Sequence, residues 1–185
     1  MMIRITPARG VFLALAIAMV VLALLATSQL AAARRPDNRD GLADVRAATD
    51  RYHRLPAAES DGYALLTDTA GITCIDNPGV GTMGVHYANS ALVGAGVIDA
   101  SRPQVLVYEP MAGGNLHLVA VEYVVLQGAW NATHGAPPTL FGQEFMLTPD
   151  GNRYGLPAFY SLHAWAWKPN PSGPFAMWNP SVDCR

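Results

Sequence analysis

The sequence predicts an α+β domain in which an N-terminal helix or helix pair precedes a mainly antiparallel sheet, shaped as a roll or a partly closed barrel. Two observations support this class. Apolar residues recur at helical spacing near residue 42, and after Thr67 the chain changes to short apolar stretches separated by Gly, Pro and Asn, which are typical of strands. Because helices and strands are segregated along the chain, a parallel doubly wound sheet is not expected.

The first 33 residues differ in composition from the rest. They contain two arginines and no acidic residue, and residues 11–26 carry no polar side chain. This run leads to a small-residue site, Ala31-x-Ala33, as in a cleaved secretory signal. The uncharged stretch over residues 10–33 is also long enough to span a bilayer. Residues 1–33 are therefore interpreted as a signal peptide or a membrane anchor.

Both interpretations place the remainder outside the cytoplasm, as a linker over residues 34–41 and a single globular domain over residues 42–185. This remainder has 10 basic and 14 acidic residues, a formal charge of −4. A nucleic-acid-binding protein needs clustered cationic residues to neutralise phosphates, and the arginines here are scattered. Nucleic acid is therefore not an expected partner, and a membrane is contacted only through residues 10–33 if they stay uncleaved.

The predicted elements follow in order. An amphipathic helix is expected over residues 41–54, where apolar residues recur at Leu42, Val45, Ala48 and Tyr52. A second short helix is expected over residues 57–66, because Pro56 suits a first helical turn. Apolar stretches rich in valine and aromatic residues predict strands over residues 71–74, 83–88, 104–109, 116–126 and 158–167.

Three segments need separate comment. A turn-rich link over residues 110–115 predicts an antiparallel pair between the third and fourth strands. Residues 139–147 fit either a short helix or a strand. The tail over residues 169–185 contains four prolines, which is too many for regular structure, and is expected to wrap the sheet as an ordered coil.

The only two cysteines, Cys74 and Cys184, both lie in the part expected to be exported. Thiols in oxidising compartments tend to pair, so one disulfide is predicted. The alternative is two unpaired buried thiols. A cysteine-based zinc site is not supported, because the chain has no CxxC or CxxH spacing.

A carboxylate stands in an apolar row on the longest predicted strand. Side chains alternate between the two faces of a strand, so Glu122 shares its face with Leu116, Leu118, Ala120, Val124 and Leu126. Burying a carboxylate is costly unless it is paired, hydrogen-bonded, protonated or bound to a metal. Glu122 is therefore the candidate catalytic residue.

Two histidines lie on other predicted strands. His86 has only Gly84 and Ala88 beside it on its own face, and His163 sits centrally in the aromatic strand. If these strands are neighbours, His86, Glu122 and His163 converge as two imidazoles and one carboxylate. Such a set suits zinc, iron or copper, with open positions for water or substrate. The alternative is that Glu122 forms a buried pair with an arginine or histidine, and that the histidines are ordinary core residues.

The remaining polar candidates rank lower. Glu109 and Glu144 are reserve carboxylates that either face solvent or replace Glu122. His53, His117 and His134 fall on a polar helix face, near a turn and in an irregular loop, and are expected to be solvated. No GxSxG elbow, P-loop or GxGxxG fingerprint indicates another kind of active site.

Aromatic residues are concentrated over residues 154–178. They either form the centre of a small core or line a cavity for a hydrophobic or planar ligand, since such cavities are mostly apolar. On the second interpretation the ligand pocket contains Tyr87, Trp165 and Trp167.

Several short motifs together resemble a group of uncharacterised exported bacterial proteins. They are MGVHYAN at residues 83–89, YEP at 108–110, VEYVV at 121–125, LFGQEF at 140–145 and LHAWAW at 162–167, followed by Asn179-Pro180 and Cys184. The resemblance covers about residues 42–185 and implies a whole protein built to one plan. It implies no activity.

The leading functional hypothesis is an exported domain with a partly buried His/Glu site in an aromatic pocket, which binds a metal ion or small molecule and acts on it. In that site Glu122 serves as ligand or base. The alternative is a non-catalytic cell-envelope protein that binds a lipid or a protein partner through its aromatic residues.

Overall fold

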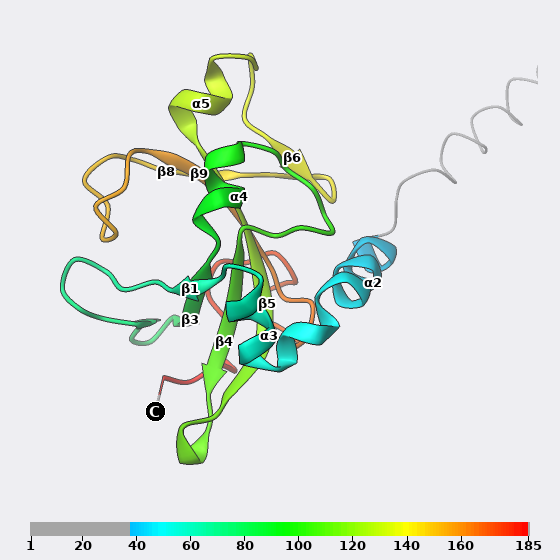
Figure 1. The fold of residues 1–185 in the computed structure, drawn as a ribbon, viewed down its shortest axis with the longest axis vertical. Coiled ribbons are helices and arrows are strands. Elements are labelled where there is room, and N and C mark those ends of the chain that lie inside the picture. Colours follow the sequence, from blue (N-terminus) through cyan, green and yellow to red (C-terminus); the bar gives the residue numbers. More distant parts are fainter. Residues whose placement is uncertain (1–37, 185) are drawn as a thin grey trace, which may run out of the picture. The chain divides into compact units, whose positions relative to one another are not determined.

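The computed structural model describes residues 38–184 (Figure 1). The interpretation of residues 1–33 as a signal or anchor falls outside this range. Among the described residues, none of the helices has both the length and the hydropathy that crossing a membrane requires.

The described chain begins with the expected helix pair. Helix α2 (Asn38–Thr49) continues into a 3-10 turn, η1 (Asp50–His53), and α3 (Leu55–Ser60) follows with Pro56 in its first turn. The predicted end of the second helix at residue 66 is wrong. Gly62 adopts a φ of 91°, which ends the helical region, and Ala64–Leu65 forms strand β1.

The sheet has seven antiparallel strands and is not closed, and the α+β class is confirmed. Strand β3 pairs with both β1 and β2 along one edge, and the order continues β3-β4-β5-β9-β8. The remaining strands are β2 (Cys74–Asn77), β3 (Gly81–Ala88), β4 (Val105–Pro110), β5 (Leu116–Leu126), β8 (Met146–Thr148) and β9 (Phe159–Ala164).

Strands β3 and β4 lie within two residues of their predicted bounds, whereas two other strands differ more. The first predicted strand, 71–74, shares only Cys74 with β2. Strand β9 ends at Ala164, three residues before the predicted end. After it, the backbone N–H of Trp165 donates to Pro174 and that of Trp167 donates to Val119, so these residues leave the ladder. The alternation of faces along β9 therefore stops before Trp167.

Short elements fill the connections. The ambiguous segment 139–147 forms a small hairpin of β6 (Thr139–Leu140) and β7 (Gln143–Glu144) and then enters β8. The sequence analysis missed helices α4 (Ser90–Ala95) and α5 (Gln127–Asn131). Helix α4 begins after an Asn89 side chain that accepts a hydrogen bond from Leu92, and ends at Gly96 in the left-handed region.

The two faces of the sheet bury separate cores. The helix-side core lies under α2, η1 and α3 and includes Val45, Tyr52, Tyr87, Tyr108 and Tyr123. The opposite face buries a smaller site-side core of Val105, Val107, Val119, Ala120, Val124, Phe159, Trp165 and Val182.

A β-bulge between β4 and β5 modifies the predicted alternation. Val107 pairs with Ala120 but Tyr108 pairs with Leu118, so Val119 is an extra residue. Leu118 consequently belongs to the helix-side core and not to the face of Glu122. The Val119 carbonyl is available at the bulge and accepts hydrogen bonds from the backbones of Trp167 and Lys168.

The predicted disulfide between Cys74 and Cys184 is confirmed. It joins β2 to the C-terminal segment, which also pairs with β3 through a bridge between Thr82 and Asn179. Disulfides persist in oxidising compartments, so the bond suggests a non-reducing, extracytoplasmic environment for the domain.

Candidate metal centre

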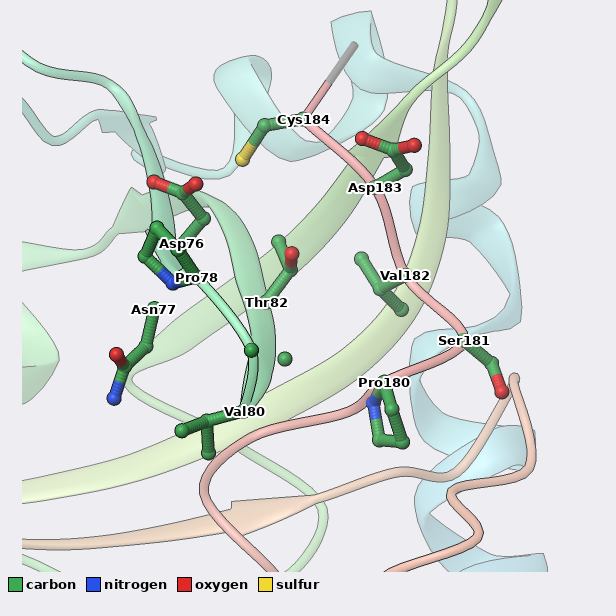
Figure 2. A pocket seen from close by; sticks show the side chains of 12 residues that line it. Asp76, Asn77, Pro78, Val80, Thr82, Pro180, Ser181, Val182, Asp183 and Cys184 are labelled. Carbon is green, nitrogen blue, oxygen red and sulfur yellow. The ribbon is translucent and has the colours of Figure 1, made fainter.

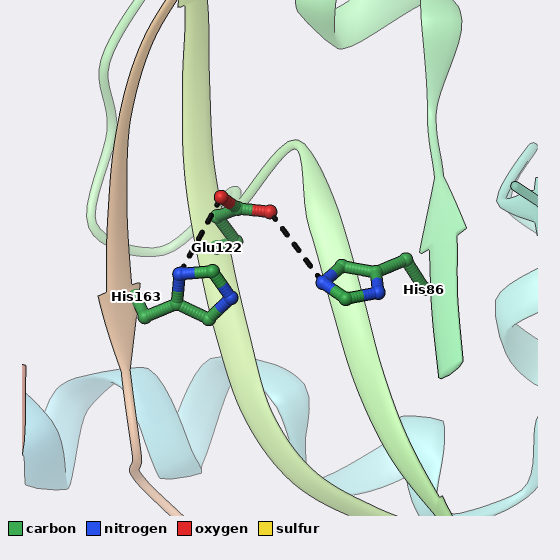
Figure 3. Close-up of side chains that lie close together, drawn as sticks. All are labelled: His86, Glu122 and His163. Atoms are coloured by element: carbon green, nitrogen blue, oxygen red, sulfur yellow. Dashed lines mark ion pairs between the residues drawn. The ribbon is translucent and has the colours of Figure 1, made fainter. Parts of the chain in front are cut away.

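The structure brings His86, Glu122 and His163 together from three strands (Figure 3). Glu122 on β5 lies directly opposite His163 on β9. Strand β4 lies between β5 and β3, the strand that carries His86. His86 on β3 is opposite Val107, and Glu122 is opposite Val105, so the two reach toward each other above the β4 valines. All three are buried, with residue exposures of 2% for His86, 8% for Glu122 and 3% for His163.

The side chains converge on one another without forming a closed hydrogen-bond network. Nδ1 of His163 lies 3.4 Å from Oε1 of Glu122, and Nε2 of His86 lies 3.9 Å from Oε2. The two imidazole rings stand almost perpendicular, with centroids 5.9 Å apart. One ligand atom from each residue can be chosen so that all lie within 4.8 Å of one another.

The ring nitrogens are the unusual feature of this cluster. Within the described chain, the buried side-chain nitrogens and oxygens that lack a hydrogen-bond partner are Nδ1 and Nε2 of His86 and Nε2 of His163. The Gly84 carbonyl is close enough to affect His86 but does not make a hydrogen bond of ordinary geometry. Leaving a buried polar atom unpaired costs about 1–3 kcal/mol. An imidazole nitrogen with a free lone pair is also the form that binds a metal.

Electrostatics favour the neutral histidines. Burial lowers the pKa of His86 to about 4, although the nearby Glu122 carboxylate opposes this effect. Burial also lowers the pKa of His163 to about 4. Burial raises the pKa of Glu122 above its ordinary range, against the opposing effects of His86 and the Ser161 hydroxyl. Both imidazoles are thus neutral at neutral pH, and each has one ring nitrogen with a lone pair for a ligand.

The distances fit a transition-metal ion with a small adjustment. Ligand atoms at about 2.0–2.2 Å from a tetrahedral ion lie roughly 3.3–3.6 Å apart. The contact between Glu122 and His163 already has this separation. The 3.9 Å between Nε2 of His86 and Glu122 must shorten by about 0.3–0.6 Å, and ligand atoms up to 4.8 Å apart must close by about 1 Å. Side-chain rotation supplies such a movement without a change in the sheet.

An apolar pocket adjoins the cluster. A cavity of about 310 Å³ lies between helix α4, strand β5 and residues 154–159, and Glu122 contributes to its lining. A smaller cavity of about 180 Å³ reaches His163 from the β8 side. The cluster is thus buried but borders space on two sides.

The structure separates the three residues expected to line a ligand pocket. Trp165 lies in the site-side core near His163, with ring centroids 6.3 Å apart, and its indole N–H donates to Ala176. Tyr87 follows His86 on β3 and therefore points to the opposite face, into the helix-side core. Trp167 donates to the Thr49 hydroxyl and packs against His53. Neither Tyr87 nor Trp167 is brought to the His/Glu cluster.

The reserve residues have other surroundings. Glu109 is buried and accepts hydrogen bonds from Lys168 at 2.7 Å, and Glu144 is exposed. His117 and His134 are exposed, and His53 is half-buried beside Trp167. None of these groups approaches the cluster formed by His86, Glu122 and His163 in the described structure.

A third cavity, of about 770 Å³, lies between the β2–β3 turn and residues 180–184 (Figure 2). Asp76 and Asp183 lie at its upper end in that view, beside Cys184. Its lining contains no histidine, so it lacks the ligand set found on the sheet.

Sequence reasoning identified only part of the lining of the apolar pocket. Tyr154 and Phe159 belong to the aromatic residues interpreted either as core or as cavity lining, whereas Leu156 is not indicated by any pattern and Val93 lies on the unpredicted helix α4. The Asn89 cap and Gly96 were the available signals for that helix. No local sequence pattern predicts that residues 154–159 lie beside β5 and line the same cavity.

Comparison of the chain with protein-family models, curated proteins and solved structures finds no match.

Proposed function

We propose that the domain binds one divalent transition-metal ion through Nε2 of His86, a carboxylate oxygen of Glu122 and a ring nitrogen of His163. The observation that carries this proposal is the location of the unpaired buried ring nitrogens, all of which belong to these two histidines in the described chain. A metal ion bound at Nε2 of His86 converts one of these unpaired atoms into a ligand, and it converts a second where Nε2 of His163 is the coordinating nitrogen.

The donor set restricts the kind of ion. Imidazole nitrogen suits zinc, iron and copper, whereas calcium and magnesium prefer oxygen ligands. Two histidines and one carboxylate also leave at least one coordination position open, as in catalytic rather than structural zinc sites. Such an ion supplies Lewis-acid polarisation of a group that occupies the open position. The protein's own contribution is to exclude bulk water and hold Glu122, which acts as ligand or as an acceptor for a proton.

Elemental analysis tests the proposal. The domain over residues 34–185, prepared without a histidine tag and with its disulfide intact, is expected to contain about one equivalent of zinc, iron or copper after exchange with each ion. His86→Ala and His163→Ala should each lose it. His117→Ala is the matched control, because His117 lies on β5 but is exposed. Equal metal content in all four proteins, or none in any, overturns the proposal.

We also propose that residues 1–33 direct export, followed either by cleavage after Ala33 or by retention as an anchor. The disulfide supports export because it needs an oxidising compartment. N-terminal sequencing of the full chain produced in a bacterial host separates the two outcomes. A protein recovered from the cytoplasm with both cysteines reduced contradicts export.

A further inference from the structure

The cavity beside Glu122 is lined largely by residues of the sheet and of helix α4. Its floor is the sheet, at Val105 and Val124, and one wall is helix α4 with Val93. The opposite wall includes Leu156 and Phe159. Glu122 is the one acidic residue in the lining, and most of the others are apolar.

A partly buried hydrogen-bond network around Asp68 holds the outer walls in place. Asp68 accepts hydrogen bonds from Arg153 at 2.8 and 3.2 Å, and its other oxygen accepts from the backbones of Ala70 and Ile72. The Thr69 backbone and hydroxyl both donate to the Arg153 carbonyl. The loop after Leu66 is thereby fixed to the segment that carries Tyr154 and Leu156. This preorganisation reduces the entropic cost of binding a molecule between them.

Glu122 gives the pocket a polar end. Its side chain is 11% exposed, although its neighbours in the sheet are buried. Glu122 lines the cavity, whereas His86 and His163 do not. Tyr154 lies close enough for the carboxylate to raise the pKa of its phenol, in addition to the larger effect of burial. A molecule in the pocket therefore meets apolar walls and one carboxylate.

We propose that this pocket binds a small, mainly apolar molecule with a single hydroxyl group, and that the hydroxyl donates to Glu122 beside the metal centre. The catalytic meaning of this binding rests on the proposed metal function, but the binding itself does not.

Size and polarity both lead to this class. A dry cavity of about 150 Å³ holds benzene, so 310 Å³ accommodates a molecule roughly twice as large. A hydroxyl has one donor hydrogen, which one carboxylate oxygen satisfies. An ammonium has three donors and would remain largely unpaired among apolar walls, and a carboxylate would meet a like charge. A molecule without a polar group would place apolar atoms against the Glu122 carboxylate and offer it no donor.

Titration calorimetry with 4-propylphenol and propylbenzene tests the proposal on metal-free and metal-loaded protein. 4-Propylphenol is expected to bind at one site, and propylbenzene at least about tenfold more weakly, because it cannot donate to a carboxylate. Val93→Trp fills the cavity and should abolish binding. Val97→Trp is the matched control, because Val97 lies just after α4, is 61% exposed and does not line the pocket.

The outcomes are distinct. If Val93→Trp fails to fold, Leu156→Trp at the rim of the pocket provides a second obstruction. The proposed binding pocket is overturned if 4-propylphenol still binds to both Val93→Trp and Leu156→Trp. It is also overturned if 4-propylphenol does not bind to the unmodified protein. Equal affinity for the two probes overturns the role of the hydroxyl. Pocket-dependent binding by a protein that holds no metal supports this inference while the metal proposal fails. If the protein takes up metal but binds neither probe, the metal proposal is supported and the pocket proposal fails.

Discussion

Glu122 and His163 lie directly opposite each other on antiparallel strands β5 and β9, with Oε1 of the first 3.4 Å from Nδ1 of the second. Opposed residues in such a pair place their side chains on the same face. The register of the sheet therefore sets this half of the metal centre, and a slip of one residue would turn one of the two side chains to the other face. The site has the rigidity of a central strand pair.

Replacing the buried Glu122 carboxylate should weaken metal binding without lowering the stability of the metal-free protein. Glu122→Gln keeps the size of the side chain and removes a charge that burial disfavours. The metal-free variant is expected to be at least as stable as the metal-free parent. A metal at 100-fold excess over its Kd raises the free energy of unfolding of the parent by about 2.7 kcal/mol, and the variant should gain much less. Chemical denaturation with and without zinc measures both quantities. A variant that is clearly less stable without metal contradicts the expectation.

Gly84 should not tolerate a side chain. It adopts a φ of 112° on strand β3, and a Cβ there would lie 2.6 Å from the Tyr108 carbonyl oxygen. Gly84→Ala is therefore expected to lower the free energy of unfolding by about 2 kcal/mol or more. Gly94→Ala on helix α4 is the control, since its Cβ meets nothing within 4 Å, and should be neutral or stabilising by up to about 1 kcal/mol. Equal effects of the two substitutions in denaturation would be inconsistent with this account.

Loss of the disulfide should cost much of the stability. Cys74 and Cys184 are 110 residues apart, and removing a native disulfide from a small domain typically costs about 2–5 kcal/mol. Cys74→Ser and Cys184→Ser are each expected to lower the denaturation midpoint by a similar amount, and the double variant by no more than either. Additive losses would indicate that each cysteine contributes through packing and not through the bond.

The ion pair that holds the pocket wall should make part of the stability sensitive to acid. Hydrogen bonds from the Ile72 backbone, followed by the Arg153 guanidinium, hold the pKa of Asp68 below its ordinary value. Because this pKa is lower in the folded state, the stabilisation is present above about pH 4 and is lost as the pH falls further. The difference in stability between the parent and Asp68→Asn should be largest near neutral pH and shrink below about pH 4. A difference that stays constant from pH 7 to 3 excludes this role for Asp68.

Much of the fold could be predicted from local patterns. Strand β5 has its predicted bounds, and the turn-rich link between β4 and β5 indicated their antiparallel pairing. The alternation of side chains predicted that Glu122 and His163 converge if their strands are neighbours, and β5 and β9 do pair. The alternation misassigned Leu118 because a bulge at Val119 shifts the register, and a bulge is set by the partner strand as much as by the strand itself.

The ligand pocket was harder to predict because it depends on tertiary contacts. Tyr87 and His86 are neighbours in sequence but lie on opposite faces of β3, so adjacency in a motif does not mean a shared site. Trp167 follows the end of β9 and turns toward Thr49. The walls of the apolar cavity come from helix α4 and residues 154–159. The pair of Arg153 with Asp68 joins the second of these segments to the loop after Leu66.

The disulfide also sets an order of events during biosynthesis. Cys74 precedes β3, β4, β5 and β9 along the chain, and Cys184 follows them all. In a chain that emerges N-terminus first, Cys74 must therefore remain unpaired, or be held by an oxidoreductase, until every long strand of the sheet has been delivered. Because the chain contains two cysteines, there is no competing intramolecular bond to rearrange. Oxidation of the two cysteines is thus a late step whose only intramolecular product is the Cys74–Cys184 bond. The bond forms after all the long strands of the sheet have been synthesised.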